Sequence, residues 1–301
     1  MVQVRLEGGR ELLYGYKQGT ESQPLIAIIT STFNAAKDLH WTINSIRSQT
    51  YANIQWIIAD GGSTDDTVEI LKQNEDVIDY WFSESDEGIY DAWNKALKYV
   101  KGEWVQFIGA GDELASSKMM CDASFYLVGA YPKYELVYGN IQIVSEVNHD
   151  LIEEIVIPWG NMKNRWQGGR LMLPMHPEVF HHKSVFYKYN QFNTCFKIAA
   201  DSYLLMQSIM SQSPLYIDLL IDKMVLGGVS SDFKNIYRVH CEIKKINKIL
   251  DISPPFFHSL IESLKVYLKI LLYIFIPKKY IYKVIDFLRV LLRKNKKWTV
   301  K

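Results

Sequence analysis

The chain has 301 residues, of which 48% are hydrophobic and 22% are charged, a composition typical of a globular protein and unlike that of a disordered or fibrous one. Its net charge of +1 argues against a dedicated nucleic-acid binder. The charge is divided unevenly, because residues 234–301 hold 16 basic and 4 acidic side chains, which leaves a net charge of −11 on residues 1–233. The sequence therefore joins an acidic body to a basic tail.

The cysteines and the apolar stretches bear on the compartment of the protein. Cys121, Cys195 and Cys241 are odd in number and widely spaced, so they indicate neither a disulfide framework nor a CxxC site. The polar N-terminus lacks the apolar run of a secretory signal. The most apolar stretch, Ile270–Ile276, is shorter than the about 20 residues that a spanning helix needs. We therefore expect a cytoplasmic protein without a transmembrane segment.

The predicted elements begin with a β-hairpin, because apolar and polar residues alternate from Val2 to Leu6 and again after a turn at Gly8-Gly9. Strands and helices then alternate. The predicted strands are Leu25–Thr30, Ile54–Ala59, Tyr80–Ser83 and Trp104–Ile108, and the predicted helices are Leu39–Gln49, Asp65–Gln73 and Tyr90–Tyr99. This order predicts an α/β fold whose central sheet is mostly parallel and carries crossover helices.

Further elements follow this alternating part. Strand patterns cover Tyr134–Ser145 and Ile152–Ile157, and the loop Pro158–Pro174 has the length of loops that are often functional. A helix is predicted from Asp201 onwards. A last strand-like run ends in Gly227–Phe233, where the basic tail begins.

Polar loops follow each of the four strands of the alternating part. They read STFNAA (Ser31–Ala36), DGGSTDDT (Asp60–Thr67), SESDEGIYDAWNKAL (Ser83–Leu97) and GAGDEL (Gly109–Leu114). Ligands of open α/β sheets bind at the carboxyl ends of the strands, so these loops are the candidate site. Helix capping is an alternative for residues such as Ser63 and Asp65. Capping explains Asp60 less well, because the two glycines after it let a ligand approach the backbone.

These four loops, with MHPEVFHH, AADSYL and GGVS further along, form an ordered set that resembles the family 2 glycosyltransferases with a GT-A fold. The set is most similar to bacterial enzymes of O-antigen, colanic acid and other exopolysaccharide assembly. The resemblance implies a GT-A catalytic domain at residues 24–233, after a hairpin extension at 1–23 and before a helical tail at 234–301. It also implies an inverting transfer of a sugar from a UDP- or GDP-sugar to a lipid-linked saccharide.

The resemblance assigns residues to the nucleotide-sugar donor. Asp60 matches the position that hydrogen-bonds the nucleotide base, a task suited to a carboxylate. The other matching positions are Thr32, Asn34, Asp86, Gly88, Asn94 and His176. Two alternatives stay open: Asn94 lies three residues from Asp91 on one helix face and could form a surface pair with it, and a lone histidine is otherwise a surface or core residue.

The resemblance also assigns a metal ligand and a catalytic base. GAGDEL matches the segment where family members bind a divalent cation, Mg²⁺ or Mn²⁺, that bridges the donor diphosphate. Only Asp112 remains of that carboxylate cluster, since Gly109 and Gly111 stand beside it. Asp201 matches the base that takes the acceptor proton, although a carboxylate at a helix start is otherwise a common N-cap. GGVS, at 227–230, matches a flexible loop near the active site.

The tail is basic and amphipathic. Lys234–Leu250 has the pattern of a mixed-charge helix, which Pro254-Pro255 ends. Phe256–Lys301 holds 11 basic and 2 acidic residues among apolar ones, in two helical halves separated at Pro277. Such helices bind anionic membrane surfaces, so we expect a peripheral protein on the inner face of the cytoplasmic membrane. The alternative is a helical hairpin packed on the catalytic domain or on a second subunit.

Two other classes of function stand beside the enzyme. A nucleotide-sugar-binding module with lost catalysis would explain the reduced carboxylate cluster but would leave Asp201 without a role. A dinucleotide oxidoreductase is disfavoured, because STFNAA and not GxGxxG follows the first strand.

Overall fold

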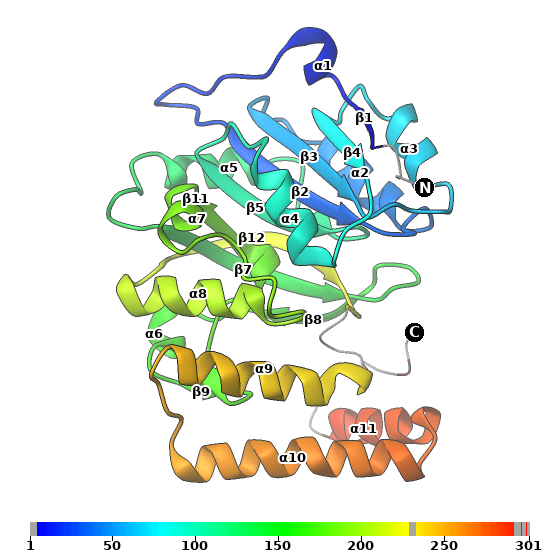
Figure 1. Cartoon of the computed structure of the whole chain (residues 1–301), viewed down its shortest axis with the longest axis vertical. Coiled ribbons are helices and arrows are strands. Elements are labelled where there is room, and N and C mark those ends of the chain that lie inside the picture. Colours follow the sequence, from blue (N-terminus) through cyan, green and yellow to red (C-terminus); the bar gives the residue numbers. More distant parts are fainter. Residues whose placement is uncertain (1–4, 229–232, 292–295, 297–298, 300–301) are drawn as a thin grey trace.

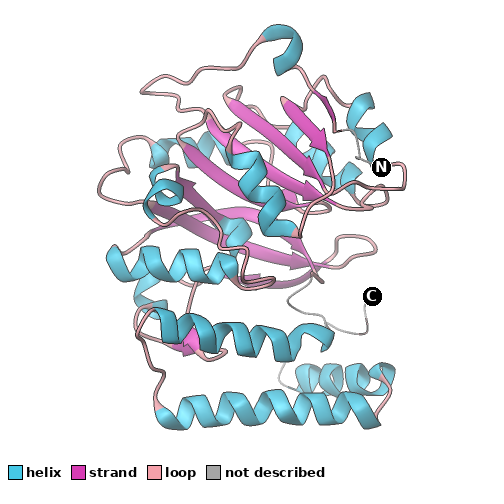
Figure 2. Ribbon diagram, viewed as in Figure 1, coloured by secondary structure: helices cyan, strands magenta, loops and turns pink. Residues whose placement is uncertain are grey.

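The computed structural model describes residues 5–228, 233–291, 296 and 299. Its centre is a ten-stranded sheet with helices on both faces, and the tail lies below it in the view of Figures 1 and 2. The strands of this sheet are β1 (Leu6–Gly8), β2 (Ile26–Thr32), β3 (Ile54–Asp60), β4 (Tyr80–Ser83), β5 (Trp104–Gly109), β6 (Glu113–Leu114), β7 (Leu136–Val144), β8 (Leu151–Ile155), β11 (Val179–His182) and β12 (Leu215–Val225). A separate two-stranded ribbon consists of β9 (Trp166–Gln167) and β10 (Arg170–Leu171).

The helices fall into a first set, which precedes residue 212, and a tail set. The first comprises α1 (Glu11–Tyr14), α2 (Leu39–Arg47), α3 (Thr67–Gln73), α4 (Ile89–Leu97), α5 (Met119–Leu127), α6 (Trp159–Met162), α7 (Ser184–Lys188) and α8 (Ala200–Ser211). The second comprises α9 (Ile236–Ile249), α10 (Phe256–Phe275) and α11 (Lys278–Leu291). Short 3₁₀ turns occur at η1 (His176–Glu178) and η3 (Phe233–Asn235).

The sheet order is β1-β4-β3-β2-β5-β11-β7-β12-β6, with β8 added beside β7. The neighbours β4, β3, β2 and β5 are parallel, and β11 runs antiparallel between β5 and β7. The predicted α/β fold with a mostly parallel sheet is therefore confirmed. Because Thr32 lies opposite Asp60 and Asp60 opposite Ser83, the loops after these strands meet at one edge of the sheet.

The two faces of the sheet are buried in separate apolar cores, because successive side chains of a strand point to opposite faces. On β2, Ile26 and Ile28 pack with α2, α3 and α5, whereas Ala27 and Ile29 pack with α4 and α8. Both faces are covered, which explains why β2 reads as a continuous apolar run. The sheet therefore forms a rigid platform for the polar loops at its edge.

The predicted N-terminal hairpin is wrong within the described residues, and residues 1–4 lie outside them. β1 pairs antiparallel with β4, with Leu6 opposite Ser83. The expected return strand, around Leu12 and Tyr14, is the short helix α1, and both of these side chains are exposed. The edge of β4 offers unpaired backbone groups, and pairing with them satisfies β1 better than an isolated two-stranded hairpin would.

The tail shares one of the two apolar cores of the sheet through α9. Ile243 and Ile246 are buried in the same apolar core as α4 and α8, so the expected boundary at 233/234 separates residues that pack together. No side chain of α10 is buried, although this helix contacts α9. Within the described ranges, no helix is both long and apolar enough to cross a membrane.

Candidate functional site

A cleft of about 820 Å³ opens at the sheet edge. Its wall combines the loop after β5, the segment around β10 and η1, the first turn of α8 and the end of β12. The charged and imidazole side chains that line it are Asp38, Asp112, Glu146, Arg170, His176 and Asp201. The fold thus brings together three residues, Asp112, His176 and Asp201, that the sequence placed far apart.

Asp60, at the end of β3, is not among the residues that line this cleft and is only 1% exposed. Its carboxylate accepts five hydrogen bonds, from Thr32 Oγ1 (2.8 Å), Ser63 Oγ (2.5 Å), Ser83 Oγ (2.6 Å) and the N–H groups of Gly62 (3.1 Å) and Ser63 (2.9 Å). A ligand that bonds this carboxylate therefore has to replace or share one of these donors. In this structure Asp60 orders the loop that follows β3.

The first and second loops are joined by Asn34, which adopts a positive φ of 51°. Its backbone N–H donates to Ser63 Oγ at 2.7 Å, and its side-chain oxygen accepts from the N–H of Thr64 at 2.9 Å. Asn34 thus contacts the second loop directly at the surface, and Thr32 contacts it through the buried carboxylate of Asp60. Hydrogen bonds therefore link the two loops directly.

The third loop packs against the second. Asp86 accepts a hydrogen bond from the N–H of Gly88 at 2.8 Å, and Gly88, at φ 118°, precedes α4. A Cβ at Gly61 would lie 2.6 Å from Asp86 Oδ2, so this close approach requires a glycine there. Asp86 and Gly88 therefore shape the rim of the donor loops.

Asn94 serves a different part of the chain from the expected one. Its amide donates to the carbonyl of Phe192 at 2.8 Å and its oxygen accepts from the N–H of Phe192 at 3.0 Å. The alternative surface pair with Asp91 is wrong, because Asp91 instead contacts Lys95 at 3.0 Å. Asn94 thus joins α4 to the Phe192 segment of the opposite half of the site.

Asp112 is buried and lines the cleft, and its carboxylate accepts hydrogen bonds from nearby backbone N–H groups. Oδ2 accepts from the N–H of Gly109 and Oδ1 from the N–H of Val225, both at 2.9 Å. Burial raises its pKa to about 6. A Cβ at Gly109 would lie 2.8 Å from Asp112 Oδ2, so a larger residue there would displace this carboxylate. The adjacent carboxylate, Glu113, contacts His149 Nδ1 at 2.6 Å.

Asp201 lies in the first turn of α8 and is partly exposed to the cleft. Its Oδ1 accepts hydrogen bonds from the Tyr90 hydroxyl at 3.0 Å and the Ser202 N–H at 2.7 Å. Burial raises its pKa, while the positive charge of Arg170 acts in the opposite direction. The N-cap alternative is wrong, since Ala199 is the N-cap residue and Glu242 of α9 accepts the hydrogen bonds before the helix.

His176 stacks on Trp93, with ring centroids 4.9 Å apart. Burial lowers its pKa to about 3, so the imidazole is neutral at physiological pH, and its Nε2 has no hydrogen-bond partner within the described part of the chain. His181 and His182 are buried on β11 and do not line the cleft. Of the GGVS segment, Gly227 and Gly228 line the cleft, and Val229 and Ser230 lie outside the described residues.

Among the described residues, no group of three histidine, cysteine, aspartate or glutamate side chains is placed to hold a metal ion. The sequence analysis also missed Tyr90 and Arg170, which interact with Asp201, and Glu242, which binds the backbone before α8. One local signal existed: Ala199 stands before α8 where a capping side chain is usual, so a partner from elsewhere was needed.

The family model described as Glycosyl transferase family 2 matches residues 27–119. An uncharacterized glycosyltransferase of Mycobacterium tuberculosis is 29% identical over 212 residues, which cover 70% of this chain and 78% of that protein. The Escherichia coli UDP-Glc:alpha-D-GlcNAc-diphosphoundecaprenol beta-1,3-glucosyltransferase WfgD is 29% identical over 135 residues, 44% of this chain and 51% of that protein.

Solved structures show the same fold at low sequence identity. Staphylococcus aureus TarS 1-349 in complex with UDP-GlcNAc aligns at a TM-score of 0.56 and 16% identity, covering 81% of this chain and 72% of that one. The mannosyltransferase PcManGT from Pyrobaculum calidifontis, in complex with GDP-Man and Mn²⁺, aligns at a TM-score of 0.55 and 18% identity, covering 82% of this chain and 70% of that one.

The chain is thus a glycosyltransferase with the GT-A fold. Residues 27–119 are its family 2 region, and the resemblance predicted from the motifs is confirmed.

Proposed function

We propose that the protein is an inverting glycosyltransferase that moves a sugar from a UDP- or GDP-sugar to a lipid-linked saccharide in bacterial surface polysaccharide synthesis. The observation that carries the proposal is the position of Asp201. Its carboxylate reaches the cleft from the first turn of α8, with Oδ1 held by Tyr90 and Ser202. This arrangement suits a base that meets an acceptor hydroxyl.

The reaction then follows from direct displacement. Asp201 takes the proton of the acceptor hydroxyl, the oxygen attacks the anomeric carbon, and the bond to the diphosphate breaks with its electron pair on the leaving group. The anomeric configuration is inverted because attack and departure occur on opposite faces. Burial raises the pKa of Asp201, which brings the carboxylate closer to the range in which a base works well at neutral pH.

The donor loops support a nucleoside diphosphate sugar as the donor. Asp60, Thr32 and Asn34 join the loops after β2 and β3 into one preorganised wall, and Asp86 packs against it. The names of similar proteins point the same way, since TarS is described with UDP-GlcNAc, PcManGT with GDP-Man and WfgD as a UDP-Glc enzyme. The lipid-linked acceptor rests on the name of WfgD, whose acceptor is a diphosphoundecaprenol saccharide.

A divalent cation would bind in this cleft only if the donor diphosphate supplied some of its oxygen ligands. Asp112 is the carboxylate that would hold it, and both of its oxygens already accept backbone hydrogen bonds. Mg²⁺ and Mn²⁺ use few protein ligands when phosphate oxygens and waters complete the shell. The cation would supply positive charge to the departing diphosphate. Arg170 is the charged basic side chain among the described residues of the cleft wall.

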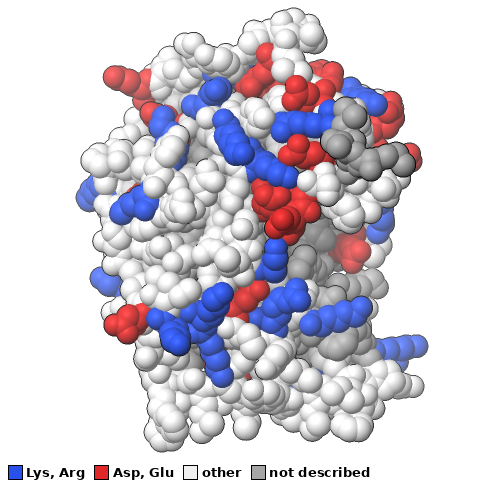
Figure 3. All heavy atoms as spheres, in the orientation of Figure 1, with Lys and Arg blue, Asp and Glu red and all other residues white. Residues whose placement is uncertain are grey.

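The tail supports a peripheral position on the inner face of the cytoplasmic membrane, where a lipid-linked acceptor is reached. The large apolar side chains exposed on α10 include Phe256, Phe257, Leu260, Leu264, Leu268, Leu271 and Phe275. Figure 3 shows basic side chains over α9 and a mostly uncharged surface over α10 on this face. An apolar helix face with basic neighbours is typical of interfacial helices.

Turnover by Asp201→Asn tests the proposal. The assay measures release of UDP or GDP from UDP-glucose, UDP-GlcNAc and GDP-mannose with GlcNAc-diphosphoundecaprenol as acceptor. We expect turnover to fall about 10²-fold to 10⁴-fold while donor affinity stays the same, because the asparagine keeps the size and loses the base. Asp122→Asn, an exposed aspartate in the first turn of α5, is the matched control and should behave like the parent.

Three results would contradict the proposal. Retention of the anomeric configuration in the product would exclude direct displacement. Near-normal turnover of Asp201→Asn with loss of donor binding would make Asp201 structural. Absence of nucleotide release with every donor, despite donor binding, would favour a nucleotide-sugar-binding module.

A further inference from the structure

We propose that Glu242, on α9 of the tail, is a positioning residue of the transfer reaction. It holds the backbone from which Asp201 reaches the cleft, so the tail completes a site whose family 2 region ends at residue 119. This inference rests on the proposed role of Asp201 as the base.

The first support is a three-bond cap. Glu242 Oε1 accepts the N–H of Lys197 at 2.9 Å, and Oε2 accepts those of Ile198 and Ala199, both at 3.0 Å. These N–H groups belong to Ala199, the N-cap residue of α8, and to the two residues before it. A negative charge there also interacts favourably with the helix dipole. Ala199 has no side chain that could cap α8, and the tail carboxylate instead fixes the backbone segment immediately before the helix.

The second support is a direct connection from this cap to the base. The carbonyl of Ile198, the central residue of the capped segment, accepts a hydrogen bond from the Tyr90 hydroxyl at 2.6 Å. The same hydroxyl is also 3.0 Å from Asp201 Oδ1, so its single proton is shared between the Ile198 carbonyl and this carboxylate. Glu242, Ile198, Tyr90 and Asp201 therefore form one continuous network, and a shift of residues 197–199 displaces both groups that orient the carboxylate.

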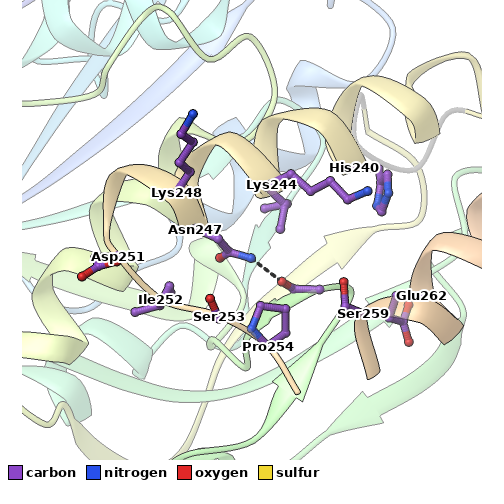
Figure 4. Close-up of a pocket in the computed structure, with 12 residues that line it drawn as sticks. His240, Lys244, Asn247, Lys248, Asp251, Ile252, Ser253, Pro254, Ser259 and Glu262 are labelled. Atoms are coloured by element: carbon purple, nitrogen blue, oxygen red, sulfur yellow. Dashed lines mark hydrogen bonds between the residues drawn. The ribbon is translucent and has the colours of Figure 1, made fainter. Parts of the chain in front are cut away.

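The third support is a second bond from α9 to the same cleft. Asn247 donates to the carbonyl of Gly169 at 2.7 Å, and both residues line the pocket of about 340 Å³ that Figure 4 shows. The next residue, Arg170, lines the cleft and interacts electrostatically with Asp201. One helix thus holds the segments that carry both charges.

The sequence of α9 agrees with a specific task for this carboxylate. Glu242 is the sole acidic residue of the helix, which also contains four basic ones. It is half-buried, and Ile243 beside it is buried in the core, so the helix is anchored at the level of the cap. A glutamate that contributed only to solubility would be exposed to solvent, as the basic residues of α9 are. Glu242 is instead half-buried against the segment before α8.

The test compares Glu242→Ala, Glu242→Gln and Ile243→Val. The alanine variant should lower kcat about 10-fold to 100-fold with the donor KM unchanged, because small displacements of a catalytic group cost this much. The glutamine variant should recover most of the rate, since one amide oxygen can accept two N–H groups. Ile243→Val loosens the same helix but leaves the cap intact, so it should keep the parental kcat below its melting temperature.

Hydrogen exchange provides a readout that needs no substrate. The amides of residues 197–199 should exchange faster in Glu242→Ala than in the parent, and at the parental rate in Ile243→Val. In an Asp201→Asn background, Glu242→Ala should lower kcat no further, because it acts through the base.

The outcomes separate the two proposals. If Asp201→Asn alone leaves turnover unchanged, the base assignment is wrong, and exchange at 197–199 still reports on the cap. If Asp201→Asn abolishes turnover while Glu242→Ala keeps kcat, or if Ile243→Val loses as much kcat as Glu242→Ala, Glu242 has no positioning role. Unchanged exchange at 197–199 in Glu242→Ala would also overturn the inference.

Discussion

Replacing Glu178 by glutamine should shift the free energy of unfolding in favour of the variant by an amount that grows as the pH rises. Glu178 lies in η1 next to the cleft histidine and is 1% exposed. Its Oε1 accepts the N–H of Met175 at 2.8 Å, while Oε2 has no hydrogen-bond partner within the described residues. Burial raises its pKa to about 8, so the folded protein keeps this carboxyl protonated at pH 7.

The sign and size follow from proton linkage. In the unfolded chain the carboxyl loses its proton near its usual pKa of 4.5, whereas the folded protein retains it until about pH 8. The folded state therefore binds more protons across this window, and the free energy of unfolding falls as pH rises. Each pKa unit corresponds to about 1.4 kcal/mol, so Glu178 costs the wild type on the order of 3 kcal/mol at pH 7 and almost nothing at pH 4.

Urea unfolding of the wild type and Glu178→Gln from pH 4 to pH 8 measures this cost. The difference in the free energy of unfolding should shift in favour of the variant by about 2.5 kcal/mol between pH 5 and pH 7. The second N–H of the glutamine amide adds a pH-independent cost of about 1–3 kcal/mol, so the slope is the test and the absolute difference is not. Glu69→Gln, an exposed glutamate on α3, is the control and should show no such slope. A pH-independent difference for Glu178→Gln would refute the reasoning.

Three further predictions concern the donor, the metal and the tail. Asp112→Ala should weaken the response of donor binding to Mn²⁺, whereas Asp60→Ala, which removes the acceptor of five hydrogen bonds, should weaken donor binding with the metal response unchanged. Identical calorimetric profiles for the two variants would contradict separate roles. Mn²⁺ alone should raise the melting temperature less than Mn²⁺ with UDP or GDP, because one carboxylate holds the cation weakly without diphosphate oxygens; equal shifts would indicate a donor-independent metal site. Deletion of residues 256–301 should leave a folded protein that binds donor but no longer sediments with anionic vesicles, and binding of the full chain should fall as salt rises to about 0.5 M. Aggregation of the truncated protein would instead assign a packing role to the tail.

The parallel half of the sheet was predictable because each strand is an apolar run that ends in a polar loop. The predicted strands Leu25–Thr30 and Ile54–Ala59 agree with β2 and β3 to within two residues at either end. Helix α5 was not predicted, since MMCDASFYL has apolar residues around most of its circumference and little periodicity. Strand β11 was also missed, because His181 and His182 resemble site residues in sequence and are buried by neighbouring strands in the fold.

The sequence predicts those site residues whose own side chain carries the proposed chemistry. It does not predict residues whose role depends on a contact with a distant part of the chain. Asp112 and Asp201 stand out as carboxylates in motifs, and both reach the cleft. Nothing in the sequence near Tyr90 shows that its hydroxyl contacts Asp201. Nothing near Glu242 shows that its carboxylate binds the backbone before α8. Such partners depend on packing between elements that are more than 40 residues apart.

The joint between α9 and the segment before α8 is flanked by two natural thiols. Cys195 stands two residues before Lys197, and Cys241 stands next to Glu242; both are free and exposed, whereas Cys121 is partly covered. After Cys121→Ala, a pair of spin labels on the two exposed thiols would report the width of the joint directly. Their distance distribution, recorded with and without vesicles and donor, would reveal whether the state of the tail is transmitted to the base.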